Sequence, residues 1–512
     1  MGKMFRHPPK KSFLHRLNVP ALIRLAESLR NTACTCDLSQ KPLTGSFNWA
    51  VVVSFDDGVE WVLRSPHAGR ALDEATAGAV LASEAATLRY IKQNSSIPVP
   101  DVYHYSSSKD NELGVPYILM SRANGHPLST FDWLPKPKGV PTVPVSSCRL
   151  LKVDEKQKVM SQLGKFMDQL SHLRFDKIGS LFEEEGSFKV KSCLLPGFLF
   201  RGRYELQGIC RGPFSEESEC YRALLSAYFG HIQHLPLEHH ALFAPVPIPR
   251  EYGCYASYLA ATERWNDFVT LGSRVENSGN RLDYFVAGQI LDRMIPGFTN
   301  NLEECNQQHG GRFALYHPDL SANNIFVDEQ CNITCIIDWA FASTVPITLL
   351  LATPGLPHPT DEWEPSLTSA FRSGFTDRFD PISWRKSRMV WLFMRLVNLD
   401  SLQDYSLLAE LYALVYGEQS ATLSTALNDQ YQQQAVTEMQ NILSADDETA
   451  TDIERHERAY FSNFSAERYA VARKVNLAST MSRAFVADRR LWQWIESALP
   501  ADSIVPSPDH KR

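Results

Sequence analysis

The residues best suited to chemistry are Asp319, Asn324 and Asp338, which lie around two short apolar segments, 325–327 and 333–337. These segments are predicted to form the two strands of an antiparallel hairpin, because each is short, apolar and bounded by turn residues. The three polar side chains would then lie at the open end of the hairpin and on the loop that precedes it. Carboxylate and amide oxygens are hard ligands, which suit Mg²⁺.

The register of this hairpin decides whether the polar side chains meet. With the turn at 329–332, Val327 is expected to pair with Cys335, and Asn324 then lies opposite Asp338. Two oxygen ligands side by side suit Mg²⁺, which keeps several waters and shares phosphate oxygens. The alternative is that these are ordinary turn residues, since Asp and Asn are common at hairpin ends.

The full pattern is His317-x-Asp319 followed by Asn324 and then by Asp338-Trp339. It resembles the aminoglycoside phosphotransferase family, which has a protein-kinase-like fold and is related to the choline kinases. The resemblance implies that Asp319 is the catalytic base and that Asn324 and Asp338 are metal ligands. It also implies ATP and Mg²⁺ as the cofactors.

A glycine turn at Gly45, Ser46 and Phe47 lies upstream, directly before a predicted hairpin of strands 49–55 and 59–64. A glycine turn alone is weak evidence for phosphate binding, because hairpins with glycine are common. Here it precedes a strand pair that ends in a cation. The three turn residues are therefore predicted to contact the nucleotide.

The return strand places Val62 and Arg64 on one face, because side chains alternate along a strand. By resemblance, Val62 packs on adenine, and Arg64 replaces the usual lysine, which changes the binding geometry. The predicted helix 71–93 points Glu84 toward the core, where a carboxylate needs a partner. We predict an Arg64–Glu84 ion pair; the alternative is that Glu84 reaches the edge of the apolar stripe and is solvated.

Met120, Ser121 and Ala123 follow a predicted strand at 117–120 and leave the sheet. In the family this segment links the two lobes, and its backbone groups hold the edge of adenine. By position, Ser121 and Ala123 would supply those backbone groups. Because only backbone groups would contact adenine, the identity of the side chains at these positions says little about the assignment.

The resemblance implies an α+β fold of the two-lobed, protein-kinase-like kind. A small N-lobe with a five-stranded, mostly antiparallel sheet would span 37–120, after an N-terminal extension at 1–36. A large, mainly helical C-lobe would span 121–512. Apolar periodicity predicts helices in both parts, and a proline-rich surface insertion is expected at 135–144. The predicted helices are 21–30, 154–173, 280–294, 384–402, 407–416 and 452–499.

The amino-acid composition limits which classes of partner and which cell compartment are expected. The chain has 512 residues, 44% of them hydrophobic, and a net charge of −7, which gives no support for a nucleic-acid partner. No apolar run is long enough for a membrane span. Its ten cysteines are scattered, as in reduced cytoplasmic proteins, and lack zinc-finger spacing. Residues 1–26 are basic, so a mitochondrial presequence is the alternative to a solvated arm.

These observations favour an ATP- and Mg²⁺-dependent phosphotransferase that acts on a small-molecule hydroxyl acceptor. The alternative is a kinase-like module that binds a nucleotide or a partner with little or no turnover. Arg64 supports that alternative, as does the absence of any acidic residue in 340–351, where the family often has one. The acceptor, the choice of ATP or GTP and the oligomeric state are left open by the sequence.

Overall fold

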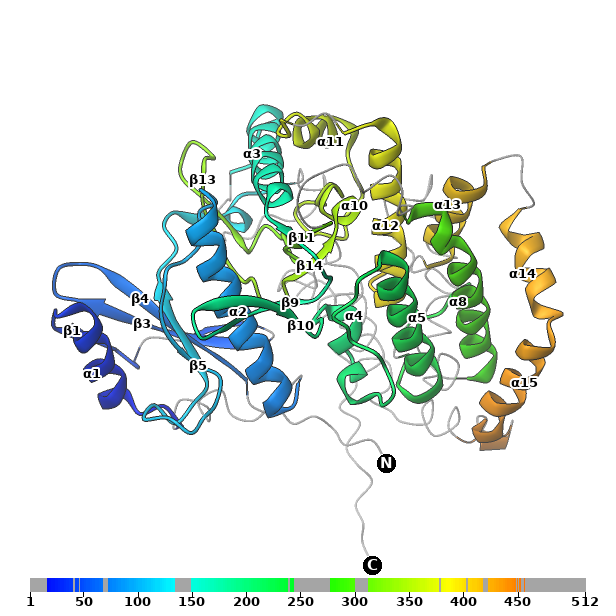
Figure 1. Cartoon of the computed structure of the whole chain (residues 1–512), viewed down its shortest axis with the longest axis horizontal. Coiled ribbons are helices and arrows are strands. Elements are labelled where there is room, and N and C mark those ends of the chain that lie inside the picture. Colours follow the sequence, from blue (N-terminus) through cyan, green and yellow to red (C-terminus); the bar gives the residue numbers. More distant parts are fainter. Residues whose placement is uncertain are drawn as a thin grey trace, which may run out of the picture.

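The computed structural model shows a β-rich lobe beside a larger helical lobe (Figure 1). This arrangement confirms the predicted α+β, two-lobed fold. No helix in the described part of the chain is long and apolar enough to cross a membrane. The structure describes residues 16–39, 42–45, 47–67, 72–133, 149–237, 240–243, 277–299, 312–376, 379–401, 404–417, 422–447, 449, 451–452 and 455.

The N-lobe contains one antiparallel sheet of six strands, in the order β1-β3-β4-β6-β5, with β2 paired to β3. Five strands were expected. The prediction missed β1 and β2, which have two residues each and are too short to show alternation. The strands are β1 (Cys34–Thr35), β2 (Leu43–Thr44), β3 (Asn48–Phe55), β4 (Glu60–Pro66), β5 (Val102–Ser106) and β6 (Tyr117–Ser121).

Each face of this sheet is covered by one helix. Trp61 and Leu63 of β4 share a buried cluster with α1 (Val19–Arg30), and Val62 and Arg64 point to the opposite face. That second face packs against α2 (Glu74–Asn94). Helix α1 and strand β1 lie entirely within the segment 1–36 that we assigned to an N-terminal extension, and they pack as part of this lobe.

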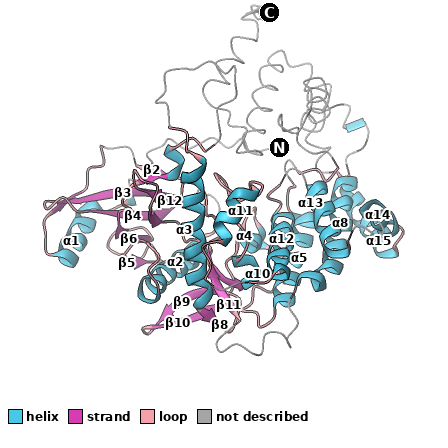
Figure 2. Cartoon of the chain, turned by 90° about the horizontal axis from the view of Figure 1, so that it is seen from above, coloured by secondary structure: helices cyan, strands magenta, loops and turns pink. Residues whose placement is uncertain are grey.

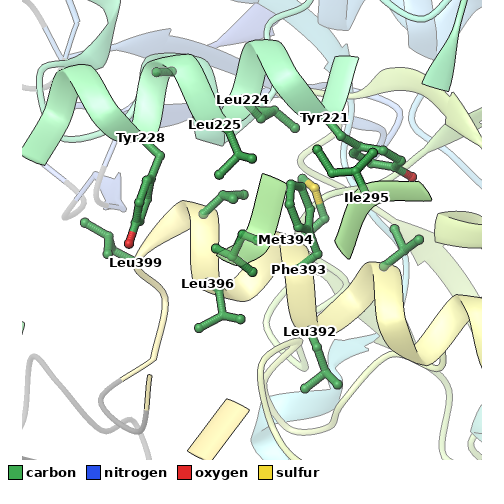
Figure 3. Packing of buried hydrophobic residues seen from close by; sticks show 14 of the residues in the cluster. Tyr221, Leu224, Leu225, Tyr228, Ile295, Leu392, Phe393, Met394, Leu396 and Leu399 are labelled. Carbon is green, nitrogen blue, oxygen red and sulfur yellow. The ribbon is translucent and has the colours of Figure 1, made fainter. Parts of the chain in front are cut away.

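The C-lobe is built on long helices that pack around α12 (Figure 2). Tyr221 and Phe393 are in edge contact, with ring centroids 5.3 Å apart, and Leu224, Leu225 and Met394 lie beside them (Figure 3). The helices are α3 (Val153–His172), α4 (Pro196–Leu199), α5 (Glu217–His234), α8 (Ser278–Phe298), α10 (Ile347–Leu350), α11 (Pro365–Arg372), α12 (Pro381–Asn398), α13 (Asp404–Tyr416), α14 (Leu423–Tyr431) and α15 (Gln434–Leu443).

Small sheets hold residues 313–346 against these helices. The predicted hairpin is present and carries a third strand that comes from the inter-lobe linker. The strands are β7 (His126–Pro127), β8 (Arg174–Phe175), β9 (Ser180–Glu184), β10 (Ser187–Lys191), β11 (Phe313–Tyr316), β12 (Ile325–Val327), β13 (Ile333–Ile336) and β14 (Ser343–Pro346).

The hairpin register differs from the predicted one. Cys335 pairs with Phe326 rather than with Val327, and the register shifts at the next pair. The carbonyl of Asn324 accepts the Ile337 N–H at 2.9 Å, so Asn324 lies opposite Ile337 and not opposite Asp338. The reason is a tighter turn: the Asp328 N–H donates to the Asn332 carbonyl at 3.0 Å, and a β-bulge, one extra residue in β13, makes up only part of the difference.

The predicted helices of the described C-lobe are present with shifted ends. Helix α8 continues past 294 to Phe298, with Pro296 inside its last turn. Helix α12 begins at Pro381 and ends at Asn398, where Leu399 adopts a left-handed conformation with φ 55°. The proline-rich insertion at 135–144 lies outside the described residues, as does nearly all of the helix expected at 452–499.

Candidate active site

Arg64 of β4 links three parts of the molecule. Its guanidinium forms the predicted ion pair with Glu84 of α2, and its Nη1 donates to Asp338 Oδ1 at 2.9 Å. The Glu84 side chain is 2% exposed and that of Arg64 is 14% exposed. A carboxylate this deeply buried is destabilising unless a cation pairs with it. The alternative of a solvated Glu84 is therefore wrong.

Asp319 and Asn324 are joined on the loop before β12. The Asn324 side-chain Nδ2 donates to the carbonyl oxygen of Asp319 at 2.9 Å and to its carboxylate Oδ2 at 3.0 Å. Asn324 is buried and Asp319 is half-buried. Because both amide protons point to Asp319, the amide oxygen of Asn324 is left to bind another group.

His317 connects this loop to the strand that carries Asp338. Its Nδ1 accepts the Asp319 backbone N–H at 3.1 Å, and its Nε2 lies 2.9 Å from the Ile337 carbonyl. These two contacts are satisfied by a neutral imidazole protonated on Nε2. Burial lowers the pKa of His317, which favours the same neutral form. Trp339 covers the ring edge to face, with centroids 4.7 Å apart. The sequence motif contained His317 but did not reveal this bridging role.

The oxygen atoms around Asp338 fit a magnesium ion. Arg64 occupies Oδ1 of Asp338, so Oδ2 is left, and the side chain is 37% exposed. Asn324 lies opposite Ile337, the residue before Asp338, and its amide oxygen is the second candidate ligand. In the described residues, no three His, Cys, Asp or Glu side chains form a metal-binding group. A site with two protein oxygens suits Mg²⁺, which takes its other ligands from water and phosphate.

The glycine turn is held on the C-lobe by aromatic contacts. The Gly45 N–H donates to the Asn48 carbonyl at 2.8 Å, which closes the turn. Phe47 stacks on Phe200 with centroids 5.0 Å apart and meets Phe341 edge to face at 5.6 Å. Ser46 lies outside the described residues. Local sequence patterns gave no signal for this contact, because its partners are distant in the chain.

A pocket lies beneath this turn, with about 500 Å³ of empty volume when open solvent is included. Phe47, Arg64 and Glu84 line it from the N-lobe, and Ala340 and Phe341 line it from the C-lobe. It therefore brings together the glycine turn, the strand cation and the helix carboxylate. The pocket combines apolar walls with one ion pair, as ligand sites commonly do.

The residues expected around adenine lie elsewhere. Val62 pairs with Met120 across β4 and β6, so the two share the α2 side of the sheet, but neither lines the pocket. The Ser121 backbone N–H donates to the Asp101 carbonyl at 2.9 Å, and the Asp101 N–H donates to the Ser121 hydroxyl at 2.9 Å. Within the described residues, Ala123 makes no backbone hydrogen bond. Its amide and carbonyl are thus available to a ligand.

One acidic residue near the catalytic loop was missed by sequence reasoning. Asp400 is exposed and follows the left-handed residue that ends α12, with its N–H bonded to the Arg395 carbonyl at 3.0 Å. Burial raises the pKa of Tyr316, and the negative charges of Asp319 and Asp400 raise it further. Asp400 therefore acts on the same tyrosine as Asp319, which is the predicted base.

Together, the β-rich lobe, the helical lobe and the segment between them define a two-lobed α+β architecture. No protein-family model matches the chain. A subtelomeric hrmA-associated cluster protein of Aspergillus fumigatus is 24% identical over 389 residues, which cover 70% of this chain and 68% of that protein. The "Altered inheritance of mitochondria protein 9, mitochondrial" of Candida tropicalis is 31% identical over 140 residues, 27% of this chain and 21% of that protein.

Several solved phosphotransferase structures align with most of the chain, but with low TM-scores. A macrolide 2'-phosphotransferase type I covers 83% of this chain and 96% of its own, at 12% identity and a TM-score of 0.35. A spectinomycin phosphotransferase in complex with ADP and spectinomycin covers 85% and 98%, at 13% identity and a TM-score of 0.35. Similarity at this level carries no functional argument, so the assignment below depends on the chain's own residues.

Proposed function

We propose that this protein is an ATP- and Mg²⁺-dependent phosphotransferase that acts on a hydroxyl group of a small-molecule acceptor. One observation carries the proposal: Arg64 bridges Glu84 and Asp338, next to the linked pair of Asp319 and Asn324. Positively charged and metal-binding groups in a cleft are what phosphoryl transfer requires, because the reaction depends on positioning and on charge stabilisation.

Asp319 is the proposed base. Its Oδ2 accepts from Asn324, which fixes the orientation of the carboxylate and leaves Oδ1 for the acceptor hydroxyl. During transfer the acceptor oxygen bonds to the γ-phosphorus, the bond to ADP breaks, and the acceptor proton passes to Asp319. His317 holds the backbone of Asp319 against Ile337 and so keeps the base in register with Asp338.

Asn324 and Asp338 are proposed to hold Mg²⁺, which when bound supplies charge neutralisation on the nucleotide phosphates. Arg64 offers a second positive charge at the same end of the cleft. Gly45, Ser46 and Phe47 are proposed to cover the phosphates. Val62, Met120, Ser121 and Ala123 are proposed to hold adenine, with the free backbone groups of Ala123 as its hydrogen-bond partners.

The acceptor would lie on the C-lobe side of Asp319. The charge of Asp400 acts on Tyr316 there, and Arg201 and Arg395 act on Asp400, so this carboxylate is a candidate to accept a hydrogen bond from a hydroxyl of the acceptor. The net charge of −7 does not favour a nucleic-acid acceptor. A screen of hydroxyl-bearing metabolites with ATP and Mg²⁺, read by ADP formation, tests the proposal and finds the acceptor class.

A second candidate function is nucleotide or partner binding with little turnover. The Arg64–Asp338 hydrogen bond favours it, because an arginine occupies one oxygen of the proposed metal ligand. In this case ATP would stabilise the protein without Mg²⁺, and no acceptor would stimulate ADP formation. Binding of ATP measured with and without chelator separates the two functions.

We propose a cytoplasmic location, with mitochondria as the alternative. The basic segment 1–26 and the name of the Candida tropicalis relative support the alternative. A fluorescent fusion at the C-terminus, imaged beside a mitochondrial marker, tests it. Removal of residues 1–26 would abolish a mitochondrial signal if this segment directs import.

A further inference from the structure

A second pocket lies in the C-lobe between α11 and α12, two helices that are neighbours in Figure 1. It is open to solvent and has about 810 Å³ of empty volume. Its walls include Glu362 and Trp363 before α11, Thr368 and Arg372 of α11, and Arg388 of α12. None of these residues belongs to the glycine turn, the catalytic loop or the inter-lobe linker.

Arg372 is the unusual cation of this pocket. Its guanidinium lies over the Trp384 ring, 4.7 Å from the centroid, and forms no ion pair with a carboxylate in the described part of the chain. Its Nε is buried and has no hydrogen-bond partner. Burial lowers the pKa of Arg372, because removal from water disfavours the charged form. An anion bound beside Arg372 would relieve this cost.

Three other polar atoms from the pocket walls are also buried without a partner: Trp363 Nε1, Thr368 Oγ1 and Arg388 Nη1. The indole and guanidinium nitrogens are hydrogen-bond donors only. Buried donors are nearly always satisfied in native proteins, so several orphan donors at one pocket indicate an absent acceptor. Because these atoms have almost no accessible surface, oxygen atoms of a ligand would satisfy them once the side chains turn toward the pocket.

The carboxylates around the pocket are already neutralised. Glu362 accepts from Arg388 at 2.9 Å and from Arg395 at 3.4 Å. Glu410 accepts from Arg388 Nε at 2.7 Å and from its Nη2 at 2.8 Å. The charges of Arg388, Arg395, Glu362 and Glu410 therefore balance among themselves, whereas Arg372 forms no ion pair with a carboxylate of the described residues.

We propose that this pocket binds the oxyanion group of a ligand, either a phosphate or a carboxylate. Arg372 supplies the opposite charge, and Trp363 and Thr368 supply hydrogen bonds. Both kinds of oxyanion match this set, because guanidinium and N–H donors bind phosphate and carboxylate oxygens alike. The site is separate from the proposed nucleotide site and does not depend on the proposed phosphotransferase activity.

The test titrates the full-length protein with inorganic phosphate and, separately, with malonate, at constant ionic strength in chloride, by calorimetry. Arg372→Gln should weaken binding about tenfold or more, the effect of losing a charged hydrogen bond. Arg222→Gln is the matched control, because Arg222 is 59% exposed and lies outside the pocket. The Arg222→Gln variant should bind each anion with the affinity of the wild type. Binding of phosphate alone, malonate alone or both identifies the oxyanion that the pocket accepts.

Thr368→Val provides a second variant with no change of charge. It should weaken the same anion several-fold, and it keeps the test valid if Arg372→Gln does not fold. The proposal is overturned if the wild type binds neither anion saturably. It is also overturned if Arg372→Gln, or Thr368→Val in its place, binds as tightly as Arg222→Gln, since the anion would then occupy another site.

Discussion

Arg64 and Asp338, 274 positions apart in the chain, are joined by a hydrogen bond of 2.9 Å from Nη1 to Oδ1. One residue belongs to the N-lobe sheet and the other follows strand β13 of the C-lobe. Since Arg64 also pairs with buried Glu84, one guanidinium ties the N-lobe helix α2 to the proposed metal ligand. The orientation of the Asp338 side chain therefore depends on a residue of the N-lobe.

Arg64→Ala should lower the free energy of unfolding by about 3–5 kcal/mol, because it leaves the buried carboxylate of Glu84 without a cation. It should also weaken ATP binding. Arg122→Ala is the control, since its pair with Glu60 is exposed and worth about 0–1 kcal/mol. Glu84→Gln should cost less than Arg64→Ala. Equal urea midpoints for Arg64→Ala and Arg122→Ala would show that the buried pair contributes nothing.

Asp319→Asn keeps the size of the side chain and removes the proton acceptor. ADP formation should fall about 10²-fold or more, which is the scale of positioned base catalysis. ATP affinity, measured by calorimetry, should stay close to that of the wild type. Asp110→Asn, at an exposed loop position, is the control and should leave the rate unchanged. A full rate in Asp319→Asn would remove Asp319 from the mechanism.

Asp338→Asn tests the proposed metal site. The variant keeps one oxygen and loses the negative charge, so ATP should stabilise it only at higher Mg²⁺ concentrations than the wild type needs. EDTA should abolish most of the ATP-induced rise in Tm of the wild type. If the Tm shift is the same with and without EDTA, Asn324 and Asp338 do not act through a metal.

Asp404 makes stability depend on pH. It is buried, its Oδ2 accepts from the Tyr284 hydroxyl at 2.5 Å, and burial raises its pKa from 3.8 to about 7. Between about pH 4 and about pH 7, the folded state keeps a proton on Asp404 that the unfolded state has lost. The stabilisation that this proton gives is complete below about pH 4 and is lost as pH rises through about 7. His240, whose pKa burial lowers, lies 3.7 Å away and acts in the opposite direction.

Asp404→Asn cannot ionise and isolates this contribution. Relative to the wild type, the variant should gain on the order of a few kcal/mol in unfolding free energy between pH 5 and pH 8. His240 is present in both proteins, so its own titration largely cancels in the difference. Urea denaturation at both pH values gives the comparison. A difference that does not change with pH would mean that Asp404 is ionised in the folded protein throughout.

Periodicity was sufficient to predict the Arg64–Glu84 pair. Alternation along β4 set the face of Arg64, and the apolar stripe of α2 set the direction of Glu84. Both signals are local, and both elements are regular. The motif around Asp319 likewise indicated which residues gather at the hairpin, although their chemical roles stay predictions.

Features that depend on irregular backbone or on distant contacts were not predictable in this way. The turn after β12 closes at Asn332 and a bulge follows in β13, so alternation, which assumes one residue per step, could not give the partner of Asn324. Phe47 meets Phe200 and Phe341 across the two lobes, and no local pattern marks such a contact. Asp400 follows the end of a helix and gains its relevance only from the position of Tyr316.

The most direct measurement of the central claim is ADP formation from ATP by the wild-type protein, followed in Mg²⁺ across the hydroxyl-metabolite screen. The account predicts turnover that at least one acceptor stimulates, and that disappears with EDTA and in Asp319→Asn. ATP binding without ADP formation, for every acceptor and at every Mg²⁺ concentration, would contradict it and favour a nucleotide-binding module.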